Sequence, residues 1–532
     1  MSSRRGLRGV APALVACALL APAAAQDELP PAPPETKSDA PAAPAPPPRE
    51  PFRGSADDLA AKFPALVTLG DIGRSRGGKP IRTVTVTAPG GEATWVALVV
   101  HGVTGGRPAD EEALVLDVAA KLAWDASALP AGAAFRFVLR ASPDAGPART
   151  GNATPTDEDR DGATDEDGPD DLDGDGVVGW MRIPDPAGAF AADDAQSALP
   201  KRADPAKGLA AAWTIVPEGR DDDGDGLFNE DGPGGVDVGR NFAVSFEEHV
   251  APAGRWAASE PETRALMDHL LADERVALVY EIGGAESIVG NPDWGGAWAK
   301  LPDDDAKLLE GLRSAHGKGH ETPLRKARAP GAGSLAATVW HQLGRVWIGR
   351  APLGRVGPPW PAAGAEWPAD HAFPKWTRAT APGLPPGAEI GVLAPRDESK
   401  PAPEVFAETL SIADFLVLAA KERAQVVFTR TATSGASGVL RIETRLANSG
   451  RLPTHTQRGA DVKGRRPLNV RIALPEGATL LAGKPLVQIE RIAGGAESEV
   501  LRWVVAGTSG GKVRIDCAGP DTGTTTLEAV IR

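Results

Sequence analysis

Apolar and polar positions change their spacing along the chain. From about residue 52 to residue 422, segments with helical spacing alternate with short runs that are almost wholly apolar. A short apolar run between turn residues is typical of a buried strand, and the helical segments are expected to cover it. The pattern therefore predicts an α/β domain with a mixed sheet flanked by helices. We expect helices at Asp57–Phe63 and Asp110–Leu122, and strands at Ile81–Ala88, Trp95–Val100, Phe135–Arg140, Val276–Ile282 and Arg345–Gly349.

A further helix is expected over the segment SEPETRALMDHLL, which begins at Ser259. Glu262 lies three residues after Ser259. In a capping box, the first side chain accepts a hydrogen bond from the backbone of the fourth residue, and the fourth side chain accepts one from the backbone of the first. The spacing therefore predicts a capping box at the start of this helix.

The last hundred or so residues follow a different rule, because apolar and polar positions alternate strictly. Leu440 and Ile442 flank Arg441, for example, and the same alternation returns in two later segments. Alternation interrupted by Gly, Pro and Asn predicts antiparallel strands with one buried face. We therefore expect a small C-terminal β-sandwich over residues 423–532, with Cys517 at an inward-facing core position.

The N-terminal region has the composition of a segment that directs export. Residues 1–25 run from a basic start through an apolar stretch to small residues, which predicts a signal peptide. Residues 26–51 are rich in Pro and Ala, which predicts a disordered linker. We expect a periplasmic or extracellular protein, with lipid anchoring at Cys17 as the alternative. No later segment is apolar for long enough to predict a transmembrane helix.

Length and charge narrow the picture further. A chain of 532 residues is too long for one compact core, which favours two folded units. The formal net charge of -14 argues against nucleic acid as a partner, because phosphate binding needs clustered Lys and Arg. After removal of the signal peptide only Cys517 would remain, so no internal disulfide is expected. The sequence leaves the oligomeric state open.

Two acidic runs, residues 157–176 and 221–232, form insertions in the α/β region, and both contain the pattern DxDxDG. Alternating carboxylates followed by Gly allow a tight loop to surround calcium with oxygen atoms. They are not EF-hands, because Gly168 and Gly232 stand where an EF-hand has its bidentate Glu. We expect structural calcium; the alternative is a solvated acidic surface. The predicted ligands are Asp157, Asp159, Asp161, Asp165, Asp171, Asp173, Asp175, Asp221, Asp223, Asp225 and Asn229.

Several motifs, in one order along the chain, resemble those of the zinc metallocarboxypeptidases of the carboxypeptidase A and B type. The motifs are IGRSRGGKPI, a strand ending in His101, SPDA from Ser142, GVDVGRNF from Gly235, and SEPETRAL from Ser259. The resemblance extends from about residue 54 to about residue 420. It implies a carboxypeptidase-like domain over residues 52–422.

The resemblance also implies a zinc site, but most of its residues are changed. The family holds zinc with two His and one Glu, and the metal activates a water molecule. His101 matches the first ligand, whereas Thr104 stands in place of the Glu and Gly283 in place of the second His. The family's general-base Glu falls near Ala351, where no acid is present. We therefore expect no zinc, no catalytic residue and no peptidase activity.

The side of the site that binds substrate is better preserved. Arg240 matches the family's Arg that binds the terminal carboxylate of the substrate, and a guanidinium can give a carboxylate two parallel hydrogen bonds. Gly239 replaces the neighbouring family Asn, although Asn241 follows. Arg182 matches a second family Arg. These three side chains, Arg240, Asn241 and Arg182, are the predicted substrate-binding residues; the alternative for Arg240 is a structural ion pair.

The function expected from these features is that of an exported pseudopeptidase with calcium-ordered loops that binds peptide or protein C-termini or other carboxylates. Two alternatives stay open. One is an active metallocarboxypeptidase with a non-standard metal site near His101. The other is a purely structural calcium-binding module.

Overall fold

The computed structural model describes residues 50–104, 110–145, 151–156, 164, 172–173, 179–192, 202–222, 224, 235–283, 301–317, 333–350, 376–391 and 403–532. The predicted signal peptide, nearly all of the linker and the position of Ala351 lie outside these residues. Of the predicted calcium ligands, only Asp173 and Asp221 lie within them. Residues 51–532 form one compact unit. In the described part of the chain, no helix is long and apolar enough to cross a membrane.

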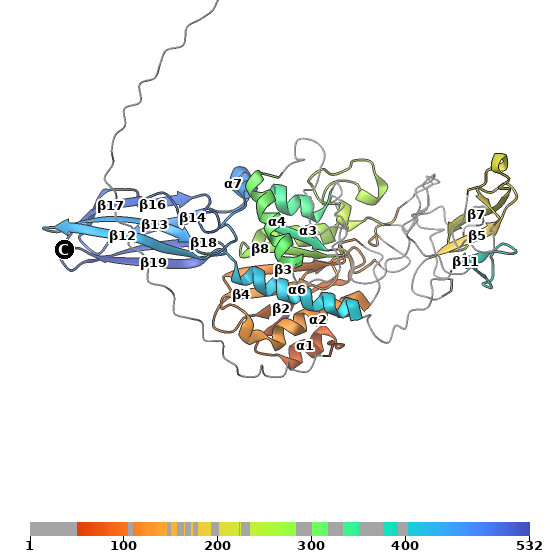
Figure 1. Cartoon of the computed structure of the whole chain (residues 1–532), viewed down its shortest axis with the longest axis horizontal. Coiled ribbons are helices and arrows are strands. Elements are labelled where there is room, and N and C mark those ends of the chain that lie inside the picture. The colour runs from red at the N-terminus through yellow and green to blue at the C-terminus, as the bar shows by residue number, and fades with distance from the viewer. Residues whose placement is uncertain are drawn as a thin grey trace, which may run out of the picture. The chain divides into compact units, whose positions relative to one another are not determined.

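A six-stranded mixed sheet forms the centre of the α/β domain (Figure 1). In spatial order its strands are β1 (Val67–Arg74), β2 (Pro80–Thr87), β4 (Ala133–Val138), β3 (Trp95–His101), β8 (Val276–Ile282) and β9 (Val346–Arg350). The pairs β1–β2 and β2–β4 are antiparallel, whereas β4–β3, β3–β8 and β8–β9 are parallel. The predicted α/β class is confirmed. The predicted strands are all present, with ends shifted by no more than two residues.

Helices cover this sheet. They include α1 (Ala56–Lys62), α2 (Asp110–Trp124), α3 (Pro261–Ala272), α4 (Asp303–Gly317) and α6 (Pro403–Lys421). α2 packs against α1 and α6 as well as against β2 and β4, and Figure 1 shows these three helices side by side. α3 packs closely on β1, because a Cβ at Gly73 would lie 2.6 Å from the Cβ of Ala265. Every residue of β3 and β8 is buried, as expected of parallel strands covered on both faces.

The start of α3 differs from the prediction. Its N-cap is Glu260, whose side chain makes no capping bond, and Pro261 is the first helical residue. The Ser259 hydroxyl donates to Glu260 Oε1 over 2.7 Å, and Glu262 Oε1 accepts from the backbone N–H of Arg76 over 2.9 Å. The predicted capping box is therefore wrong, because Glu262 binds the distant Arg76 and the Ser259 hydroxyl is engaged by Glu260 and by the Asn241 amide.

A second, five-stranded antiparallel sheet comes from segments that the hydrophobic pattern does not single out. In spatial order its strands are β10 (Trp376–Arg378), β11 (Glu389–Gly391), β5 (Trp180–Pro184), β7 (Ala211–Pro217) and β6 (Phe190–Ala191). β6, β10 and β11 are too short to show a period-two pattern. Arg182 on β5 pairs in register with Glu389 on β11.

The C-terminal segment forms two four-stranded antiparallel sheets. One has the order β12 (Val426–Ala436), β13 (Val439–Asn448), β17 (Leu501–Ala506), β15 (Thr479–Ala482); the other has the order β16 (Leu486–Ile489), β14 (Leu468–Ala473), β18 (Lys512–Gly519), β19 (Gly523–Val530). Trp503 on the first sheet and Ile515 on the second belong to one hydrophobic core, so the predicted sandwich is confirmed. Cys517 is 2% exposed in this core, and burial raises the pKa of its thiol to about 12.

Candidate functional site

The SPDA motif holds the turn between β1 and β2. Asp144 Oδ1 accepts from the Ser75 hydroxyl over 2.9 Å, and Asp144 Oδ2 accepts from the backbone N–H of Gly77 over 2.7 Å. The ammonium group of Lys79 lies 3.8 Å from the same carboxylate. Asp144 therefore fixes the conformation of the IGRSRGGKPI turn and is engaged by the protein itself.

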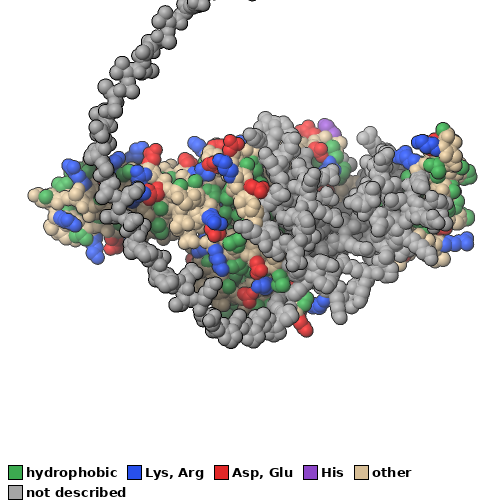
Figure 2. All heavy atoms as spheres, in the orientation of Figure 1, with side chains coloured by type: hydrophobic (Ala, Val, Ile, Leu, Met, Phe, Trp, Pro, Cys, Tyr) green, Lys and Arg blue, Asp and Glu red, His purple; other side chains and the backbone are tan. Residues whose placement is uncertain are grey.

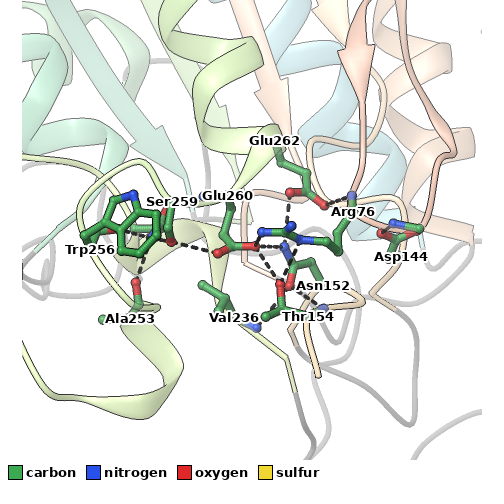
Figure 3. A network of polar contacts seen from close by, with 12 residues as sticks. Arg76, Asp144, Asn152, Thr154, Val236, Ala253, Trp256, Ser259, Glu260 and Glu262 are labelled. Atoms are coloured by element: carbon green, nitrogen blue, oxygen red, sulfur yellow. Dashed lines mark hydrogen bonds and ion pairs between the residues drawn. The ribbon is translucent and has the colours of Figure 1, made fainter. Parts of the chain in front are cut away.

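The two acids of the SEPET motif complete this network, which Figure 3 shows. Arg76 donates from its backbone to Glu262 and from its guanidinium to Glu260 over 3.0 Å. The Asn152 amide donates to Glu260 over 2.8 Å and to Glu262 over 3.1 Å, and Thr154 adds a bond of 2.6 Å to Glu260. We call Arg76, Asp144, Asn152, Glu260 and Glu262 the turn cluster. It connects β1, the loop after β4 and the start of α3.

Burial and hydrogen bonding act differently on the two acids. Burial alone would raise the pKa of Glu260, but bonds from Thr154, Asn152, Ser259 and Arg76 together lower it. Burial raises the pKa of Glu262 above its ordinary value, because its hydrogen bonds do not compensate fully. Glu260 and Glu262 are 2% and 0% exposed, so neither is placed to meet a substrate.

His101 ends β3 and is completely buried. Its Nδ1 lies 2.6 Å from the backbone oxygen of Leu139. A carbonyl only accepts, so Nδ1 carries a proton. His101 pairs in register with Ile282 at the end of β8, which places Gly283 beside this region. Gly283 has a φ of +79°.

Thr104 and Gly239, which the sequence predicts to stand at two changed positions of the family pattern, lie in contact. A Cβ at Gly239 would lie 2.4 Å from Thr104 Oγ1 and 3.1 Å from Asp237 Oδ1. No side chain fits at position 239 without movement of Thr104. We call His101, Thr104, Gly239 and Gly283 the His101 region.

Arg240 follows directly and forms an ion pair with Glu247. Their side chains are 37% and 42% exposed, so this pair lies at the surface. Asn241, by contrast, is completely buried. Its amide donates to the backbone oxygens of Ala253 and Trp256 and to the Ser259 hydroxyl, and its side-chain oxygen accepts from the backbone of Glu260. Asn241 thus holds the loop that carries Arg240 against the start of α3.

Arg182 lies in different surroundings on the five-stranded sheet. Its guanidinium carbon is 4.2 Å from the centre of the Trp213 ring and 4.7 Å from that of Trp376, so two aromatic faces flank the cation. Its Nε donates to Glu389 over 2.6 Å, and the residue is 9% exposed. None of the described contacts joins Arg182 to His101 or Arg240.

The described residues do not fit a zinc site. Among them no three His, Cys, Asp or Glu side chains converge where a metal ion would be held. At the positions that resemble the family's ligands, His101 can supply at most one ring nitrogen, Thr104 a hydroxyl and Gly283 no side chain. A zinc site needs three or four strong donors.

Glu218, at the end of β7, is a site residue that the sequence does not single out. It is 1% exposed, and its carboxylate accepts from the backbone N–H groups of Leu172, Asp173 and Gly179 over 2.7, 3.0 and 2.9 Å. Burial is the main cause that raises its pKa to about 7, with the charge of Asp173 adding to it. Glu218 thus binds the backbone at the end of the first acidic run. In the sequence, only its position just before the second acidic run could have indicated this role.

Comparison with known proteins gives two results. A protein-family model described as a domain of unknown function (DUF8731) matches residues 425–530, which form the sandwich. The match covers a minor part of the chain. No curated protein matches the chain.

The chain is similar in fold to metallocarboxypeptidases of known structure. Thrombin activatable fibrinolysis inhibitor (TAFI) is 12% identical with a TM-score of 0.38, and the match covers 69% of this chain and 73% of that chain. Carboxypeptidase A from Helicoverpa armigera is 16% identical with a TM-score of 0.34, over 56% and 63%. The metallo-carboxypeptidase from Burkholderia cenocepacia is 13% identical with a TM-score of 0.33, over 68% and 66%.

Proposed function

We propose that this chain is an exported carboxypeptidase-like protein without peptidase activity, which binds the carboxylate of peptide or protein C-termini at Arg240. Export is supported by the basic, apolar and small residues that follow one another over residues 1–25. The lack of activity is supported by Thr104 and Gly283, which offer no strong metal ligand beside His101.

The observation that carries the proposal is the exposed ion pair between Arg240 and Glu247. An exposed pair of this kind contributes only about 0–1 kcal/mol, so an incoming carboxylate can replace Glu247 at little cost. The guanidinium presents a planar set of donors that matches a carboxylate. The buried side chain of Asn241 holds the backbone next to Arg240 in place through four hydrogen bonds.

Binding of short peptides by the mature chain tests this proposal. A peptide with a free C-terminus should bind, whereas the same peptide with a C-terminal amide should not. Arg240→Gln should abolish the binding, and Glu247→Gln should strengthen it because the competing carboxylate is gone. Arg255→Gln is the matched control, since Arg255 is an exposed arginine of the loop before α3. Equal binding of both peptides would contradict carboxylate recognition.

The same samples distinguish the pseudopeptidase from an active enzyme. Elemental analysis after dialysis without chelator should find no stoichiometric zinc, and the peptide should be recovered uncleaved. One tightly held zinc per chain together with cleavage would instead identify a metallocarboxypeptidase with other ligands joining His101.

We further propose that calcium orders the two acidic runs. The supporting observation is Glu218, whose buried carboxylate binds the backbone at residues 172–173 while lying close to the charge of Asp173. A cation bound by the run would offset this repulsion between carboxylates. Calcium should therefore raise the melting temperature of the chain, with a saturable dependence on its concentration. An equal effect of magnesium, or none of calcium, would leave only a solvated acidic surface.

A further inference from the structure

An open cleft of about 690 Å³ lies between α3 and the sandwich strands β14 and β18. From the α/β domain it is lined by Arg136 on β4, His269 on α3 and Arg275 just before β8. From the sandwich it is lined by Arg466 and Asn469. Neither the motifs of the carboxypeptidase-like domain nor the His101 region contributes to it.

Positive charge is in excess at this cleft. One carboxylate, that of Asp273, serves two guanidinium groups: Arg136 donates to it over 2.9 Å, and Arg275 donates over 2.8 and 2.9 Å. Five arginines and three acids lie in or directly behind the cleft, an excess of two positive charges in a chain whose net charge is -14. They are Arg136, Arg275, Arg345, Arg465 and Arg466, and Asp273, Glu274 and Asp521.

On the face drawn in Figure 2, the described surface carries both charges, with Asp and Glu side chains among the Lys and Arg side chains.

Two of these arginines are buried behind the cleft wall. Arg345 is 3% exposed and Arg465 is 9% exposed. Arg345 donates to the backbone oxygen of Asp273 over 3.4 Å, and Arg465 donates to that of Glu274 over 2.6 Å. Among the described residues, neither Nε atom has a hydrogen-bond partner. Arg465 is also paired with the buried carboxylate of Asp521 over 3.2 Å. Solvent does not screen a buried cation well, so the charge of Arg345, for which the described residues show no ion pair, extends into the cleft.

His269 responds to this charge. Arg136 Nη1 lies 2.9 Å from His269 Nε2. Arginine can only donate, so the imidazole accepts at Nε2 and carries its proton on Nδ1. Burial, together with the charge of Arg136, lowers the pKa of His269 to about 4. At neutral pH this side chain is therefore an uncharged ring with one N–H to donate.

We propose that the cleft binds a small organic anion carrying a phosphate or carboxylate group. Its donors are available: Arg466 holds Glu274 through Nε alone, at 2.6 Å from both oxygens, and neither of its Nη atoms has a partner among the described residues. Arg136 Nη2 likewise has no described partner. Guanidinium groups bind the oxygens of phosphate and carboxylate through paired N–H bonds. The volume of the cleft is that of a small-molecule site, larger than one inorganic ion requires.

Titration calorimetry on the mature chain, with inorganic phosphate and with citrate at matched ionic strength, tests this assignment. At least one of the two should bind with saturable heat above that of chloride. Arg466→Gln should weaken the binding roughly tenfold, because a charged bidentate donor is lost. Arg471→Gln is the control: it removes the same charge from an exposed position of β14 outside the cleft and should change nothing. Binding of phosphate alone assigns a phosphoryl ligand, and binding of citrate alone assigns a carboxylate.

A second measurement tests whether the anion that produces the heat binds in the cleft. The bound anion offsets the charge of Arg136, so the pKa of His269 followed by NMR should rise from about 4. Arg240→Gln should leave the binding intact. No saturable heat with either anion, no movement of the His269 titration, or loss of binding in Arg240→Gln would each overturn the proposal. The last outcome would assign the anion to the site at Arg240.

Discussion

The turn cluster and the His101 region both consist of residues at family-motif positions or their direct neighbours, but their side chains do opposite things. In the turn cluster, Asp144, Glu260 and Glu262 each accept two or more hydrogen bonds from groups distant in sequence. In the His101 region, Thr104 and Gly239 pack against each other, and Gly283 has no side chain. One group joins β1, α3 and the loop after β4. The His101 region keeps a single side chain of the metal-binding type, the imidazole of His101.

A sequence motif can contain both residues that stabilise the fold and residues that carry out the reaction, and the two groups separate these roles. Residues that satisfy buried backbone and side-chain groups are needed for the fold, because loss of a partner leaves a buried polar group without a hydrogen bond. Residues that hold a catalytic metal are needed chiefly for the reaction. A chain can therefore keep the first set and lose the second, and a resemblance that rests on the first set predicts the fold better than the activity.

The comparison is tested most strongly by rebuilding the His101 region. Thr104→Glu together with Gly283→His should raise zinc affinity at least about a thousandfold, because three ligands would then surround one metal. The gain will be reduced by about 1–2 kcal/mol, because a histidine at φ +79° is strained. Competition with a chromophoric chelator measures the affinity.

The matched control is Thr104→Gln with Gly283→His, which has the same shape but lacks the carboxylate ligand. It should bind zinc far more weakly than the Glu variant. No gain in either variant would mean that the alignment of Thr104 and Gly283 with the family's ligands is wrong.

Removal of an acid from the turn cluster should have the next largest effect. Glu262→Ala leaves the Arg76 backbone N–H and the Asn152 amide without one acceptor each in a buried site. We expect a loss of about 3 kcal/mol in the free energy of unfolding, measured with denaturant. Glu247→Ala is the matched control, because it removes an exposed carboxylate and should cost about 0–1 kcal/mol. Equal losses would remove the distinction between the two groups.

The central fold could be predicted because its signal is local. β3 and β8 are buried along their whole length, so each is an almost wholly apolar run, and β13 shows its inward face as a period of two. The five-stranded sheet could not be predicted. It pairs Arg182 with Glu389, which lie in segments far apart in the chain, and three of its strands have only two or three residues.

The site was predictable only in its residue types. The prediction that Thr104 and Gly283 stand at the positions of metal ligands could be made from the sequence alone. The contact between Thr104 and Gly239, the ion pair of Arg240 with Glu247 and the bonds from Glu218 to the loop backbone are not, because no periodicity connects such positions. The capping box failed for a similar reason: Glu262 binds Arg76 and Ser259 binds Asn241, and both partners lie outside the helix.

Glu218, like the acids of the turn cluster, accepts hydrogen bonds from the backbone, but burial disfavours its charged form. Its pKa is raised from 4.5 to about 7, so the folded state favours the protonated form. The stability it contributes is fully present below pH 4.5 and is lost as pH rises through 7, by up to about 3 kcal/mol. Glu218→Gln should remove this part of the pH dependence. Denaturant unfolding of both proteins between pH 4.5 and 8, with chelator present, measures it; parallel curves would contradict the raised pKa.

The smallest expected effect concerns the contact within the His101 region. Gly239→Ala should destabilise the chain by about 1–2 kcal/mol, because its Cβ would lie 2.4 Å from Thr104 Oγ1. Thr104→Ala removes that oxygen, so Gly239→Ala should cost clearly less in the Thr104→Ala background. A double-mutant cycle should then give a coupling of about 1 kcal/mol. Such a coupling would mean that the two departures from the family pattern depend on each other, since a side chain at 239 requires a different residue at 104. Additive effects would mean that Thr104 moves aside freely, and that a ligand at position 104 can be restored without regard to Gly239.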